Sequence, residues 1–206
     1  MTWYADNILL AATPGATARL SDDPLLRPHS CLITNLDGHE WYRPEHRHSL
    51  PEGGLLVIRP VAAPDSHSAS WYGEAVLDWS LPDAPPLSAA LIDGLDATAF
   101  DYPGPPLSFR RFLASLAAGL KQPVLYHACA MWGGSIEQEY CFAYTPVETL
   151  FVTRPDMPFQ TADTDPVIPY LTENALVRGL ALIGIDSPTG YFAPHTRAFP
   201  WRDHAL

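Results

Sequence analysis

The sequence predicts an α+β fold in which helices pack on one face of an antiparallel sheet. The 206-residue chain contains 22 prolines, spread almost throughout, and they break it into short elements rather than a long helical bundle. Hydrophobic residues make up 47% of the chain, which is enough for a sizeable core without disulfides or metals. The clearest patterning lies in the second half, whose elements follow the order α-β-β-β-α.

The first half is predicted to be rich in strands. Ser30–Asn35 and Gly54–Val61 are apolar runs, and the latter contains four consecutive aliphatic residues, as in a strand buried on both faces. Glu74–Ser80 alternates apolar and acidic residues, as in a strand with one solvated face. Leu87–Leu95 is a candidate short helix. We treat residues 1–206 as a single domain, with a possible subdomain boundary near residue 105.

Two helices are predicted in the second half. Ser108 can cap a helix whose apolar residues recur at helical spacing until Pro123 ends it. Asp165 can cap another, with Pro166 at its first position and Gly184 near its end.

Three strands are predicted between these helices. Val124–Met131 and Ile136–Tyr144 flank Gly133-Gly134, a pair suited to a two-residue hairpin turn, and Val147–Arg154 can add a third strand. A turn centred on the glycines places Met131 opposite Ile136, Cys129 opposite Gln138 and His127 opposite Tyr140.

This register divides the hairpin into two faces, because side chains alternate along a strand. The predicted core face carries Leu125, His127, Cys129, Met131, Ile136, Gln138, Tyr140 and Phe142. The other face, predicted to meet solvent or a partner, carries Tyr126, Ala128, Ala130, Glu137, Glu139 and Cys141. Cys141 and His127 then point to opposite faces and cannot act as a nucleophile and its base. His127 is interpreted as a core histidine, bonded to Tyr140 or a backbone carbonyl.

The segment between residues 38 and 48 concentrates residues that can bind metals. They are His39, Glu40, Glu45, His46 and His48. In an extended segment His46 and His48 share a face, but the spacing is not that of a helical zinc motif, and Arg43 and Arg47 would repel a cation. We therefore predict a solvated loop that contacts a partner through His39, Glu40 and Trp41, with His39, Glu45, His46 and His48 as the alternative metal ligands.

Charge indicates the kind of partner. Twelve basic and 23 acidic residues give a net charge of −11, which disfavours nucleic acid and anionic membranes and favours a basic protein. No signal peptide or membrane span is recognisable, so a cytoplasmic protein with three reduced thiols is expected.

The C-terminal region combines aromatic residues with prolines. Tyr191, Phe192, Phe199 and Trp201 are expected to lie across their own domain, because a free aromatic tail would be adhesive. The alternative is an arm that docks on another subunit.

These features favour a non-enzymatic acidic binding protein without cofactors, such as an immunity-type inhibitor of a basic bacterial toxin. Its predicted contact residues are Glu137, Glu139 and the loop residues named above, together with Trp132, which is either a core residue or an anchor for the partner. One alternative is a hydrolase, metal-dependent or not, that uses the His39–His48 segment or Glu137 and Glu139. The other is a structural subunit of a larger assembly.

Overall fold

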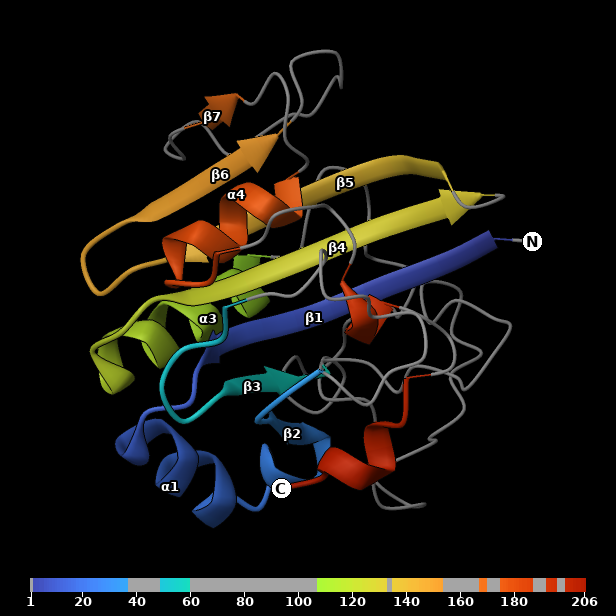
Figure 1. The fold of residues 1–206 in the computed structure, drawn as a ribbon. Helices are drawn as coiled ribbons and strands as arrows, with labels where there is room; N and C mark the ends of the chain where they lie inside the picture. The colour runs from blue at the N-terminus through green and yellow to red at the C-terminus, as the bar shows by residue number, and fades with distance from the viewer. Residues whose placement is uncertain are drawn as a thin grey trace.

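A computed structural model describes most of the predicted sheet. The described residues are 2–36, 49–59, 107–132, 135–153, 167–169, 175–186, 192–195 and 199–206. Seven strands in this part of the chain form one sheet in the order β2-β3-β1-β4-β5-β6-β7 (Figure 1). The strands are β1 (Thr2–Ala11), β2 (Ser30–Ile33), β3 (Leu55–Ile58), β4 (Val124–Trp132), β5 (Ser135–Tyr144), β6 (Thr149–Thr153) and β7 (Val167–Pro169). Every neighbouring pair is antiparallel except β6 with β7, which confirms the α+β class.

The strand β1 lies inside the sheet, between β3 and β4, and was not predicted from the sequence. It pairs with β3 on one side and with β4 along eight residues on the other. Ile8, Leu9 and Leu10 are fully buried although they alternate between faces. A strand can be apolar on both faces only where both faces are covered.

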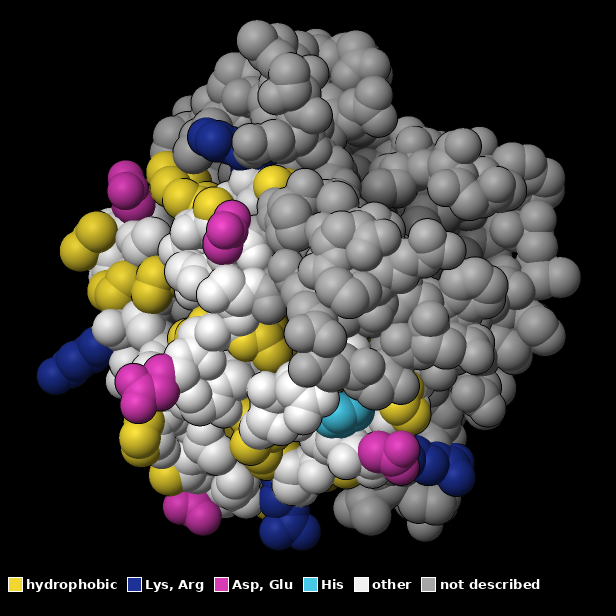
Figure 2. Space-filling model, in the orientation of Figure 1, with side chains coloured by type: hydrophobic (Ala, Val, Ile, Leu, Met, Phe, Trp, Pro, Cys, Tyr) yellow, Lys and Arg dark blue, Asp and Glu magenta, His cyan; other side chains and the backbone are white. Residues whose placement is uncertain are grey.

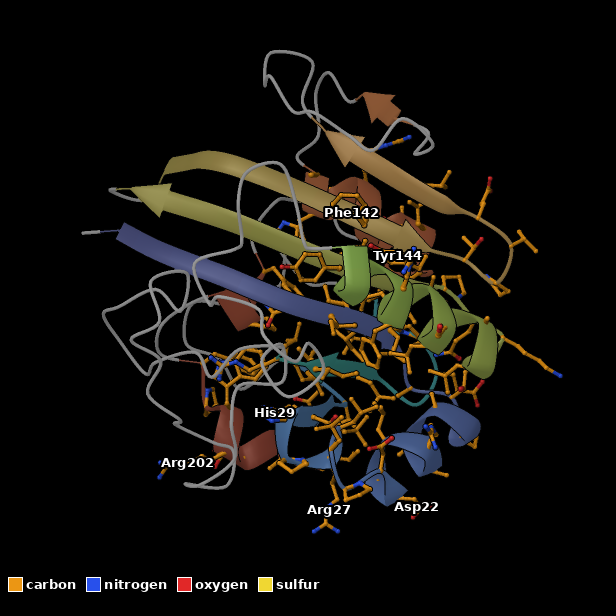
Figure 3. The ribbon with its side chains drawn as sticks, turned by 180° about the vertical axis from the view of Figure 1, so that it is seen from behind. Asp22, Arg27, His29, Phe142, Tyr144 and Arg202 are labelled. Carbon is orange, nitrogen blue, oxygen red and sulfur yellow. The ribbon has the colours of Figure 1, made fainter. Side chains whose placement is uncertain are left out.

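Helices cover both faces, whereas the sequence analysis placed them on one. The helices α1 (Pro14–Asp22) and α3 (Leu107–Leu120) lie on one face and α4 (Ala175–Leu182) on the other (Figures 1 and 3). Short 3-10 helices follow at η1 (Arg27–His29), η4 (Ala193–His195) and η5 (Trp201–His204). The helix predicted between Ser108 and Pro123 is confirmed, but it begins at Leu107, so Ser108 lies inside the helix rather than capping it, and it ends at Leu120.

Each face of the sheet has its own apolar cluster. Under α1 and α3, the sheet contributes Tyr126, Phe142 and Tyr144, of which Phe142 and Tyr144 are seen from the α3 side in Figure 3. Under α4, it contributes Leu125, Cys141 and other residues that alternate with the first set. The sheet is consequently the middle of three layers.

The register of the β4–β5 hairpin differs from the predicted one beyond its first residues. Met131 lies opposite Ile136 as expected, but a β-bulge follows, so that Ala130 pairs with Gln138 and His127 pairs with Cys141. The extra residue, Glu137, shifts all later pairs by one position. Beyond the bulge, the side chains of β5 therefore point to the face opposite the predicted one, relative to those of β4. The predicted face assignment is therefore wrong: Phe142 shares a face with Tyr126, and Tyr126 and Cys141 are fully buried rather than solvated.

The predicted helix from Asp165 to Gly184 is correct only in its second part. Residues Val167–Pro169 instead form β7, which adds to the edge of β6, and the helix begins at Ala175. Pro169 explains the difference, since a proline within a helix removes a hydrogen bond and clashes with the preceding turn. The predicted elements at 74–80 and 87–95, and the boundary near 105, lie outside the described residues.

Candidate functional site

The predicted partner-binding residues fall largely outside the described part. Residues 37–48, which include His39, Glu40 and Trp41 and the alternative metal ligands Glu45, His46 and His48, are not among the described residues. The backbone of Trp132 pairs with that of Ser135 at the tip of the hairpin, and Cys129 pairs with Glu139. The side chains of Trp132, Glu137 and Glu139 are not described, so their roles stay predictions.

A row of buried polar side chains crosses the middle of the sheet beneath α4. Asn7 on β1, His127 on β4 and Cys141 on β5 lie directly opposite one another. All three are buried, and His127 and Cys141 have no exposed surface. Directly opposed residues point to the same face of a sheet, so the prediction that His127 and Cys141 lie on opposite faces is wrong.

This row has the geometry of a structural feature rather than of a reactive site. The Cys141 thiol donates a hydrogen bond to the carbonyl oxygen of Ala175 at a distance of 3.0 Å. Gly179 brings α4 so close that an added Cβ would lie 3.0 Å from the Cys141 sulfur and 2.8 Å from a Leu125 methyl carbon. A nucleophilic cysteine needs a thiolate and access for the substrate, and this thiol is protonated and covered. His127 is buried as predicted.

The described C-terminal residues pack on their own domain, as predicted, while Tyr191 lies outside the described residues. Phe192, Phe199 and Trp201 are buried in the cluster beneath α4. The backbone N–H of Leu206 donates to Ser30, and Ala205 forms a bridge with Cys31. The last residues therefore cover β2, the strand at the edge of the sheet, where unpaired backbone groups would otherwise be exposed.

Aromatic contacts hold this C-terminal segment in place. The Arg59 guanidinium lies 4.5 Å above the Trp201 ring, and Phe199 meets Trp201 edge to face at 4.7 Å between ring centroids. His204 stacks on Phe199 at 5.1 Å. Burial lowers the pKa of His204 below its ordinary value of 6.5, against the opposing effects of Asp203 and a hydrogen bond to the Leu32 backbone.

On the opposite face, described residues of α1, α3 and the turn after α1 line an open hollow. We call it the α1–α3 groove; its volume is about 500 Å³. Its apolar lining consists of Leu25, Leu26, Phe112, Leu116 and Leu120, and Gly15, Gly119 and Ser115 complete the helix walls. A Cβ added at Gly15 or Gly119 would meet no atom within 4 Å, so these glycines face open space. The groove thus matches small-molecule sites in volume and in its mainly apolar lining.

A polar contact joins the two helices where α1 begins and α3 has ended. The Thr13 hydroxyl donates to the side-chain carbonyl of Gln122 at 2.8 Å, and the Gln122 amide donates to the carbonyl of Ala11 at 2.9 Å. Thr13 also accepts from the Ala16 N–H as the N-cap of α1. One side chain therefore both starts α1 and sets its distance from α3.

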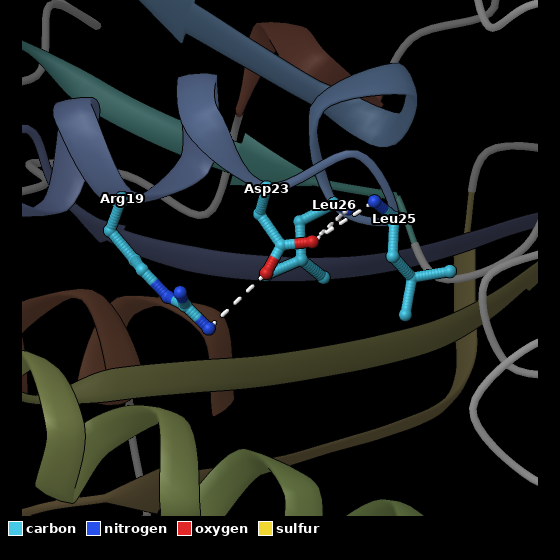
Figure 4. A network of polar contacts seen from close by, with 4 residues as sticks. All are labelled: Arg19, Asp23, Leu25 and Leu26. Atoms are coloured by element: carbon cyan, nitrogen blue, oxygen red, sulfur yellow. Dashed lines mark hydrogen bonds and ion pairs between the residues drawn. The ribbon is translucent and has the colours of Figure 1, made fainter.

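An ion pair lines the groove at the other end of α1. Asp23 accepts hydrogen bonds from the backbone N–H groups of Leu25 and Leu26 through one oxygen and contacts Arg19 at 3.2 Å through the other (Figure 4). The Arg19 side chain is 62% exposed. The Asp23 charge is thus shared among three donors, while Arg19 keeps further N–H groups directed to solvent.

The groove residues were not predicted from the sequence, although two local signals of helix α1 were present. Thr13 followed by Pro14 is a helix-start signature, with an N-cap residue and proline at the first helical position. Arg19 and Asp23 have the i, i+4 spacing of a helix-surface ion pair. Neither signal indicates that α1 lies beside α3, because the two helices are about ninety residues apart in the chain.

A metal-ligand cluster and a membrane-spanning helix are both missing from the described part of the chain. Within it, no three His, Cys, Asp or Glu side chains gather as metal ligands. No helix there has the length and apolar character needed to cross a membrane.

Comparison with known proteins leaves the function to be argued from the molecule itself. No protein-family model matches the chain, and no characterised sequence or solved structure has significant similarity to it.

Proposed function

We propose that this chain is an acidic, non-enzymatic binding protein that recognises a basic protein in the cytoplasm. The concrete form of the proposal is an immunity-type inhibitor of a basic bacterial toxin. The supporting observation is the net charge of −11 and its uneven distribution along the sequence.

The side chains that the structure describes are nearly balanced in charge. Seven are basic (Arg19, Arg27, Arg59, Arg111, Lys121, Arg178 and Arg202) and six are acidic (Asp22, Asp23, Glu52, Glu148, Asp186 and Asp203). The described charges in Figure 2 are scattered rather than gathered into a patch of one sign. The whole chain has 12 basic and 23 acidic residues, so the remaining five basic and seventeen acidic residues carry its entire negative charge.

One segment concentrates this excess. Residues 60–106 contain seven aspartate and glutamate residues and no lysine or arginine. A region of one sign attracts a basic partner over a distance of about one Debye length, roughly 8 Å at physiological ionic strength. We place the contact surface on Glu137 and Glu139 of β5, on Trp132 at the end of β4, and on His39, Glu40 and Trp41.

The described residues offer less support for the other two functions. Cys141 and His127, a potential nucleophile and base that lie side by side, are buried beneath α4. The hydrolase alternative therefore rests on Glu137 and Glu139 or on the His39–His48 segment. The aromatic residues Phe192, Phe199 and Trp201, which could have anchored a structural subunit to an assembly, are buried in their own domain. Cys31 and Cys141 are buried and form no disulfide, which fits a reducing compartment.

This proposal can be tested by recovering a partner in a pull-down and then measuring its association kinetics. We expect wild-type association to slow as salt rises, and the double variant Glu137→Lys/Glu139→Lys to slow it further. Glu52→Lys/Glu148→Lys is the matched control, because it changes the net charge by the same amount at two acidic residues outside the proposed contact surface. Trp41→Ala should speed dissociation, as removal of an aromatic anchor does.

Each result has a defined consequence. A larger effect of the hairpin variant than of the control supports the proposed surface, and equal effects remove that surface. Salt-independent association overturns recognition by charge. Failure to recover a partner, together with stoichiometric metal in the purified protein, replaces this proposal with the hydrolase.

A further inference from the structure

We propose that the α1–α3 groove binds a small amphiphilic carboxylate, with its apolar chain between the helices and its carboxylate on Arg19. This site shares no residue with the contact surface proposed for a basic protein, so the two proposals are independent. The proposed site depends on the shape of the groove, on its polar end and on the charges around it.

The shape of the groove suits an apolar chain. Leu26 and Leu116 are buried at 2% and 8% exposure, while Phe112 and Leu120 are half-buried, so the apolar lining reaches from the core to the surface. Gly15 and Gly119 leave space on both helices where other residues would fill it. Filling this volume with a ligand would remove apolar surface from water, which is the main source of affinity in such sites.

The polar end of the groove favours an anion over a cation. Asp23 already accepts two backbone hydrogen bonds and one ion pair, so its oxygens are engaged. Arg19 contacts Asp23 through a single nitrogen, Nη2, and a guanidinium can bind a second carboxylate through its remaining N–H groups. Ser115 supplies a hydroxyl on the facing helix.

The surrounding charges act in the same direction. Arg111 lies one turn before Ser115 and is exposed, and Lys121 is exposed just after α3. Helix α3 contains no acidic residue. Although the chain as a whole is acidic, the described charges on and just after α3 are therefore positive, and they favour an anion near this groove from beyond its lining.

Three probes of equal chain length test the proposal: octanoate, octan-1-ol and octylammonium. Binding is followed by amide chemical shifts of the full-length protein. We expect octanoate to shift residues of α1 and α3, and to bind about two- to fivefold more tightly than octan-1-ol, the effect of one exposed ion contact. Octylammonium should bind most weakly. Arg19→Gln should reduce octanoate affinity to that of octan-1-ol, whereas Arg178→Gln, on α4, should leave it unchanged.

Steric variants test the location. Gly119→Leu should abolish octanoate binding while the protein stays folded, since the new side chain enters open space. Ser115→Tyr obstructs the same groove from an exposed position and serves if the first variant is unstable. Equal binding of octanoate and octylammonium, unchanged binding in the folded steric variants, or no binding of any probe at millimolar concentration would overturn the proposal.

Discussion

The two helix-covered faces of the sheet use glycine in opposite ways. On the α4 face, Gly179 allows the helix to approach until Leu125 and Cys141 occupy the place of a side chain. On the α1–α3 face, Gly119 has nothing near the position of its absent Cβ. One face is thus closed by the lack of a side chain and the other is left hollow by it. A glycine within a helix therefore has no fixed meaning until the surface opposite is known.

The largest difference between the faces should appear when a leucine is shortened on each helix. Leu180 is fully buried in the cluster beneath α4. Leu180→Ala should lower the free energy of unfolding by about 2–5 kcal/mol, because the substitution leaves a closed cavity. Leu116→Ala should cost less than about 2 kcal/mol, because its lost volume merges with the open groove. Urea unfolding measures both. The reverse order would show that the groove is filled in solution.

The two glycines provide a sharper and smaller contrast. Gly179→Ala should destabilise the fold by about 1–3 kcal/mol, because the added methyl group overpacks a region already in contact. Gly119→Ala should stabilise it by about 0.5–1 kcal/mol, because alanine favours the helix and meets no atom. Thermal unfolding of both variants measures the difference. Equal changes of the same sign would contradict the described approach of α4 to the sheet.

The smallest expected effect concerns pH and the C-terminal segment on the α4 face. Burial lowers the pKa of His204 in the folded protein, so the unfolded chain binds more protons as pH falls below 6.5. Stability from this group is therefore fully present above pH 6.5 and is lost as pH falls toward the lowered pKa. We expect His204→Gln to flatten that part of the stability profile, measured by denaturant midpoints between pH 7 and pH 5. An unchanged slope would indicate that His204 titrates alike in both states.

Strong local patterns were enough to predict several elements correctly. The apolar stripe through Leu113 and Leu116 predicted α3, and Pro123 predicted where it stops. The consecutive aliphatic residues of β3 and the paired runs around Gly133-Gly134 predicted three strands, as observed. Each of these signals is contained within a dozen or so residues, so no knowledge of the neighbouring elements is needed.

The candidate site was much less predictable. Its side chains come from α1, the turn after it and α3, which are distant in the chain and joined by the Thr13–Gln122 contact. The prediction of reduced thiols is confirmed for Cys31 and Cys141, which form no disulfide. The side chain of Cys129 is not described, so the count of three remains a prediction. Glu137 and Glu139 likewise remain proposed contact residues.

The sequence by itself determined that the chain is acidic, that it forms a set of short apolar strands, and that α3 has one clear buried face. Tertiary structure decided how those elements meet. The bulge at Glu137 placed His127 beside Cys141, and β1 became an inner strand of a sheet covered on both faces. The physical reason is that a local pattern records which residues avoid water. Which face they cover, and in which register, depends on contacts with segments far along the chain.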